Sequence, residues 1–137
     1  MTRMAAGMSA MLAAVLFAML APALAAHHAF SAEFDAKKPV KLHGTVSKVE
    51  WVNPHAWIHI HVITKRGKAE DWMIEGGTPN ALFRRGITRE SLKAGTEIVV
   101  AGFQAKDGSR RANGRDLTLA DGRKLFLGSS GTGIPDK

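Results

Sequence analysis

The sequence predicts an all-β protein with little helix, of the OB type: a five-stranded barrel with one short helix between its third and fourth strands. Three observations carry this expectation. Short segments alternate apolar and polar side chains, which is the period of a half-buried strand. Turn residues separate these segments. A single helical stretch follows the third segment, and three strands, a helix and two more strands is the order of an OB-fold. A generic small β-sandwich is the alternative architecture.

The first strand is expected to bend. Residues 40–46 alternate apolar and polar side chains, but the phase has changed by residues 49–52. This change predicts a β-bulge or a strong bend near Ser47-Lys48. The dipeptide Asn53-Pro54 is a turn signal that ends the strand.

The second strand, residues 55–62, alternates without interruption, so its side chains divide cleanly between two faces. A polar turn at residues 65–68 leads into the third strand, residues 70–75, which Gly76-Gly77 closes. One face of the second strand carries Ala56, Ile58, Ile60 and Val62, and the other carries His55, Trp57, His59 and His61.

A short helix is expected at residues 80–85. Thr78 is a good N-cap, Pro79 suits the first helical position and Gly86 ends the helix. A second short turn is expected at residues 88–93.

The remaining residues predict a fourth strand, a last hairpin and a loose end. The fourth strand covers residues 97–103, and a last hairpin joins residues 110–120 to 124–127 around the turn dipeptide Asp121-Gly122. The tail, residues 128–137, is rich in Gly and Ser and is expected to be flexible.

The chain divides into two parts of different composition. Residues 1–25 hold 20 apolar residues and one charge, and Ala23-x-Ala25 fits the rule for secretory cleavage. We therefore expect a signal peptide at 1–25, a histidine-containing segment at 26–37, the OB-like domain at 38–127 and the flexible tail. The mature protein is expected to be periplasmic or secreted, with no stable membrane span after cleavage.

Composition excludes several classes of function. The 137 residues include 19 Lys and Arg against 12 Asp and Glu, but an exported protein has little nucleic acid to meet, so no nucleic-acid partner is expected. The absence of cysteine excludes disulfides, thiolate nucleophiles and thiolate metal sites. The sequence also lacks a Gly-x-Ser-x-Gly elbow and a P-loop, so we do not expect an enzyme.

The histidines carry the sharpest chemical signal, because all six lie between His27 and His61. Cleavage after Ala25 would give a chain that begins Ala26-His27-His28. Its amine, two backbone amides and the His28 imidazole would then offer four nitrogens in a plane, a geometry that selects Cu(II) or Ni(II). Cleavage one residue later would leave the amine and imidazole of His27 to chelate a metal together.

A second set of histidines lies on the second strand. Residues two apart on a strand point the same way, about 6.5–7 Å apart, so His59 and His61 can serve one metal ion, and His55 continues the row. The same row equally fits the ordinary polar face of a half-exposed strand. Any further ligand is expected from His43, from the N-terminal segment or from the carboxylates Glu33, Asp35, Glu50 and Glu75.

Aromatic and basic residues offer weaker signals. Trp51, Asn53 and Trp57 are candidates for a ligand-binding face, although such aromatic residues more often pack a barrel or its rim. The pairs Arg84-Arg85 and Arg110-Arg111 are expected to be solvated surface.

Three motifs carry a resemblance that covers nearly the whole mature chain. They are the mature start HHAFSAEFD at residues 27–35, VEWVNPHA at residues 49–56, and Pro79-Asn80-Ala81-Leu82 followed by Arg85-Gly86. The chain resembles a family of small exported proteobacterial proteins known only as a domain of unknown function. The resemblance implies export and a compact β-rich domain, and it implies no activity.

The function that the residues favour is that of an exported periplasmic binding protein that holds a divalent metal through histidines. Cu(II) is favoured over Zn(II) and Ni(II), and a dedicated Cu(I) site is not expected, because Met73 is the only methionine outside the leader. Two alternatives stay open. One is a non-metal interaction module that binds a peptide, a glycan or an envelope protein, and the other is an accessory subunit of a periplasmic redox enzyme. The metal ligands expected are His27, His28, His55, His59 and His61.

Overall fold

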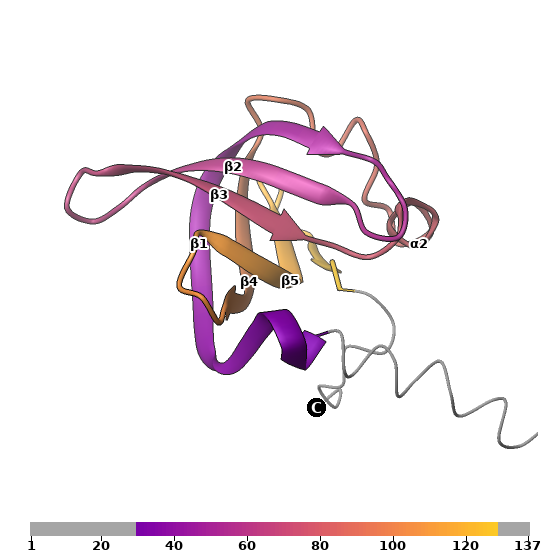
Figure 1. Cartoon of the computed structure of the whole chain (residues 1–137). Coiled ribbons are helices and arrows are strands. Elements are labelled where there is room, and N and C mark those ends of the chain that lie inside the picture. Colours follow the sequence, from indigo (N-terminus) through magenta and orange to yellow (C-terminus); the bar gives the residue numbers. More distant parts are fainter. Residues whose placement is uncertain (1–29, 129–137) are drawn as a thin grey trace, which may run out of the picture.

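The computed structural model describes residues 30–128, which form mostly β-structure (Figure 1). A helical turn at residues 30–33 precedes the first strand. The signal peptide expected at 1–25 and the tail from residue 129 onwards lie outside the described residues. The elements are β1 (Phe34–Glu50), β2 (Trp57–Ile63), β3 (Ala69–Glu75), α2 (Pro79–Arg84), β4 (Glu97–Ala105), β5 (Arg111–Leu119) and β6 (Lys124–Phe126).

All six strands belong to one sheet, in the order β3-β2-β1-β4-β5-β6. Neighbours in this order are antiparallel, whereas an additional pairing joins β3 to β5 in parallel, with residues 73–75 beside residues 111–113. The pairings from β3 through β2, β1, β4 and β5 therefore lead back to β3. The expected β-rich class with one short helix after the third strand is confirmed, with β6 as a sixth, three-residue strand.

β1 pairs with β2 and β4 along different parts of its length. Its second half pairs with β2, from Gly44 opposite Val62 to Glu50 opposite Trp57, while Lys41 and its neighbours pair with β4. The strand has 17 residues, much longer than an ordinary strand of five or six. A strand of this length must bend to serve both partners.

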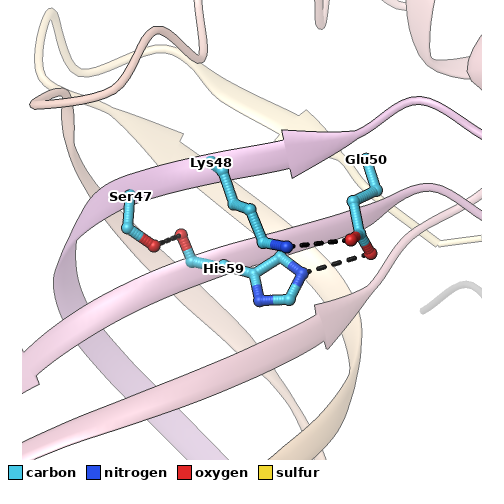
Figure 2. Close-up of polar contacts among 4 residues, drawn as sticks. All are labelled: Ser47, Lys48, Glu50 and His59. Atoms are coloured by element: carbon cyan, nitrogen blue, oxygen red, sulfur yellow. Dashed lines mark hydrogen bonds and ion pairs between the residues drawn. The ribbon is translucent and has the colours of Figure 1, made fainter.

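The expected bulge in β1 is confirmed. The register with β2 shifts between Val46 and Lys48, and the extra residue, Ser47, donates a hydrogen bond from its hydroxyl to the carbonyl oxygen of His59 at 3.1 Å. The bulge shifts the alternation of β1 by one residue, so that Lys48 and Glu50 lie on the same face as His59 of β2 (Figure 2).

β1 begins at Phe34, six residues before the expected start of the first strand. Residues 34–39 do not alternate and contain Pro39, which lacks a backbone N–H. Pairing with β4 carries this segment as strand in spite of its sequence, with a register shift between Phe34 and Pro39. Residues 34–37 of the expected N-terminal segment thus belong to the sheet.

The core lies on the inner face of the sheet. The apolar face predicted for β2 is confirmed, because its side chains are almost fully buried. α2 and the turn after it close one end of the core with Leu82, Ile87 and Leu92. The β2 residues in the core are Ala56, Ile58, Ile60 and Val62.

The helix forms as its capping residues predict. The hydroxyl of Thr78 accepts a hydrogen bond from the Ala81 amide at 3.2 Å, and Pro79 occupies the first turn. Gly86 adopts φ +86°, a conformation that favours glycine, and so ends the helix. Within residues 30–128 no helix is long and apolar enough to cross a membrane.

Candidate functional site

The strand histidines lie on or just before β2, on the face opposite the core. His59 faces β1, where Glu50 ends the strand beyond the bulge. Its Nε2 atom lies 3.2 Å from Oε2 of Glu50, and Nζ of Lys48 lies 2.9 Å from the other carboxylate oxygen (Figure 2). Hydrogen bonds from Lys48 and then from His59 hold the pKa of the Glu50 carboxyl below its usual value. An ionised carboxylate only accepts, so Nε2 of His59 carries a hydrogen, and in the neutral imidazole Nδ1 then keeps the lone pair.

His61 faces the other neighbour of β2. Its Nδ1 atom lies 2.9 Å from Oδ1 of Asp71, the residue directly opposite it on β3. The carboxylate is well exposed and accepts the hydrogen bond, so in the neutral imidazole Nε2 of His61 carries the lone pair.

His55 lies just before β2, at the end of the sheet near α2. Its Nδ1 atom lies 3.2 Å from the carbonyl oxygen of Gly76 and 3.5 Å from Oε1 of Glu75. A carbonyl oxygen can only accept, so Nδ1 carries a hydrogen, and in the neutral imidazole the lone pair is on Nε2. About a third of the His55 side chain is exposed, so this nitrogen belongs to a group that is accessible from solvent.

Glu75 is one of two buried polar residues among those described, and the other is its neighbour Asn113. Removal from water raises the pKa of the Glu75 carboxyl, and the nearby charge of Glu33 raises it further. The charges of His55 and Arg111 and a hydrogen bond from Asn113 act in the opposite direction. The parallel pairing of β3 with β5 places Glu75 directly opposite Asn113.

The three imidazoles diverge. His59 turns to β1, His61 turns to β3, and His55 turns to the backbone beyond β3. Within residues 30–128 no three His, Cys, Asp or Glu side chains are grouped as metal ligands. His43 is separate as well, because it lines an open groove of about 220 Å³ with Glu97 and Thr118. Of the acidic candidates, Glu50 and Glu75 contact histidines.

The N-terminal segment is fastened to β4 and to the start of β5, which pairs with the end of β3 next to His55. Phe30 packs on Phe34 and meets Phe103 edge to face, with ring centroids 6.0 and 5.9 Å apart respectively. Nη2 of Arg111 lies 3.0 Å from Oε2 of Glu33. We call Phe30, Glu33, Phe34, Phe103 and Arg111 the N-terminal clasp. His27 and His28 precede it and lie outside the described residues.

The structure divides each of the two arginine pairs that were expected to be solvated. Arg110 and Arg84 are exposed, but Arg111 is half-buried and stacks on Trp57 and Phe34, with its guanidinium carbon 5.3 and 6.0 Å from the ring centroids. Arg85 is also half-buried and lies 4.7 Å from the centroid of Phe126. No local pattern could have found Arg111, because its partners Glu33, Phe34 and Trp57 are distant from it in the sequence.

The three residues of the candidate ligand face, Trp51, Asn53 and Trp57, lie in different surroundings. Trp51 packs against Phe83 of α2 at a centroid distance of 5.0 Å, and Arg89 lies over its ring at 5.4 Å. Arg111 covers Trp57. Asn53 is exposed in the connection between β1 and β2 and forms a cis peptide bond with Pro54.

Comparison with known proteins gives a family and no activity. The model of a family of unknown function, DUF6152, matches residues 14–114. The match confirms the expected resemblance to a family known only as a domain of unknown function. No curated protein and no solved structure has significant similarity to the chain.

Proposed function

We propose that this chain, which belongs to the DUF6152 family, is an exported, periplasmic or secreted protein that binds Cu(II) through histidines. The primary ligands in this proposal are His27 and His28 with His55, and the row His59 and His61 is a weaker second set. We also propose that the five long strands form an OB-like barrel, since the parallel pairing of β3 with β5 closes their ring of neighbours.

The observation that carries the metal proposal is the hydrogen bonding of the histidines. In the neutral form of His55, His59 and His61, one ring N–H faces an acceptor and the other ring nitrogen has a lone pair. Metal-binding histidines have this arrangement, because the acceptor fixes the tautomer and makes the ligating nitrogen more basic. A neutral imidazole held in this way does not have to reorient when a metal arrives.

His55 is the strand histidine best placed to meet the N-terminus. The charge of Glu33, in the N-terminal clasp, raises the pKa of the Glu75 carboxyl, which contacts His55. His28 precedes Phe30 by two residues, so its Cα lies within about 7 Å of the Phe30 Cα by chain geometry alone. The clasp therefore limits how far the terminal histidines can lie from Arg111 at the start of β5.

The donor set selects the metal. Imidazole, amine and amide nitrogens suit Cu(II), which also binds more tightly than Ni(II) or Zn(II) to a given nitrogen site. Affinity is expected to fall as the pH drops through the histidine range, because a ligating imidazole must be neutral.

Cu(II) titration of the purified, processed protein tests the proposal. Replacement of both terminal histidines, His27→Ala with His28→Ala, is expected to weaken binding by far more than tenfold, and His55→Ala by about tenfold, or about 1.4 kcal/mol. His43→Ala is the matched control, because it also removes one imidazole but lies in the separate groove. Unchanged affinity in both the terminal and the His55 variants would refute the proposal.

A non-metal interaction module is the second candidate function. Phe83 and Val52 are exposed next to Trp51, and such an apolar patch suits a peptide or an envelope protein, including a periplasmic redox enzyme. This function predicts that Phe83→Ser abolishes binding of such a partner while Cu(II) affinity stays the same, and that a chelator has no effect on the complex.

A further inference from the structure

The hairpin formed by β2 and β3 projects beyond the rest of the sheet, at the end opposite α2 (Figure 1). The last paired residues are Ile63 and Ala69. The turn beyond them is well ordered by hydrogen bonds, from the Thr64 amide to the Lys68 carbonyl at 2.9 Å and from the Lys68 amide to the Thr64 hydroxyl at 3.1 Å. The tip therefore presents its side chains on a fixed frame.

Three cations gather on this tip, namely Lys65, Arg66 and Lys68. All three are exposed, and in the part of the chain that the structure describes none has an ion pair. The nearest acidic residues are engaged elsewhere. Glu70 accepts from the Trp72 indole at 3.0 Å and lies 3.7 Å from Arg110, while Asp71 pairs with His61.

The tip also carries an unusual apolar residue. Ile63 is 60% exposed, the highest value among the large hydrophobic residues that the structure describes. An exposed isoleucine beside three cations matches the layered chemistry of a membrane surface, with acyl chains beneath anionic headgroups. A soluble polyanion would neutralise the cations and leave Ile63 in water.

We propose that the tip of the β2–β3 hairpin binds the surface of a bilayer that contains anionic phospholipids. Lys65, Arg66 and Lys68 contact lipid phosphates, and Ile63 enters the boundary between headgroups and acyl chains. This inference rests on residues that the proposed metal site does not use, so either proposal can fail without the other.

Vesicle co-sedimentation tests the inference, with phosphatidylcholine vesicles that do or do not contain phosphatidylglycerol and with a chelator present throughout. A juxtamembrane cation contributes about 1 kcal/mol on an anionic membrane, or about fivefold in the partition constant. The variant Lys65→Gln, Arg66→Gln, Lys68→Gln is therefore expected to partition about 100-fold more weakly. The matched control Lys37→Gln, Lys41→Gln, Lys124→Gln removes the same charge from exposed strand positions and should lose much less.

A second variant separates a lipid surface from a general polyanion site. Ile63→Ser keeps the charge and is expected to lower partitioning several-fold, because it removes the inserted side chain. Equal losses in the two triple variants would overturn the proposal, since net charge would then explain the binding. Unchanged partitioning of Ile63→Ser, or equal binding to vesicles without phosphatidylglycerol, would overturn it as well.

Discussion

Arg111 is expected to fasten the N-terminal segment to the sheet, and its replacement by alanine should reveal this role. The variant removes a partly exposed ion pair with Glu33, which contributes about 0.5 kcal/mol. It also removes two cation–π contacts, with Trp57 and Phe34, each of which contributes about 0.5–1 kcal/mol. Arg111→Ala should therefore lower the free energy of unfolding by about 2 kcal/mol.

Urea unfolding followed by tryptophan fluorescence measures this change, and the sequence offers a control in the adjacent residue. Arg110 is exposed and lies 3.7 Å from Glu70, so Arg110→Ala should lower the free energy of unfolding by less than about 0.5 kcal/mol. Arg111→Lys keeps the charge but loses the planar group that stacks, and it should fall between the two. Equal effects of the Arg110 and Arg111 alanine variants would refute the stacking argument.

Three further predictions concern the fold and the buried carboxyl. Gly102→Ala would place a Cβ atom 2.0 Å from the Asn113 carbonyl oxygen, so β4 and β5 must separate. Thermal unfolding should then show a free energy of unfolding that is lower by about 3 kcal/mol or more. The control Gly76→Ala should lower it by less, because its Cβ atom meets the end of the Leu127 side chain at 3.2 Å. Thr78→Ala removes the N-cap and should lower stability by about 1 kcal/mol in urea, while Thr78→Asn should retain most of it. Burial raises the pKa of Glu75 in the folded protein, so the carboxyl favours the fold at low pH and this contribution is lost as the pH rises through its folded pKa. Glu75→Gln should therefore gain stability relative to the wild type as the pH rises above the ordinary pKa of a carboxyl, and a difference that is constant with pH would contradict this reasoning.

The sequence predicts best the features that depend on local pattern. The buried face of β2, the bulge at Ser47 and the cap at Thr78 each follow from a few consecutive residues, and the structure confirms all three. Alternation fixes which face of a strand a side chain occupies because the strand period is two.

Features that depend on distant partners could not be predicted. The early start of β1 at Phe34 requires β4, which follows about sixty residues later. The histidine row shows the same limit, since a shared face does not set the side-chain rotamers. Glu50 turns His59 towards β1, and Asp71 turns His61 towards β3. From the sequence, Glu50 is expected only as a further metal ligand, and Asp71 is not among the expected ligands.

The double pairing of β1 has a kinetic consequence. β1, β2 and β3 follow one another as neighbouring antiparallel strands, as do β4 and β5, so each group can form from contacts that are close in sequence. The two groups join only when Lys41 pairs with Ala101 and Glu75 pairs with Asn113. The two residues of each pair lie far apart along the chain. Closing such long loops is slow, because chain entropy is lost before the new contacts form. We expect this joining step to limit the rate of folding, with the β1–β4 and β3–β5 contacts forming together at its end.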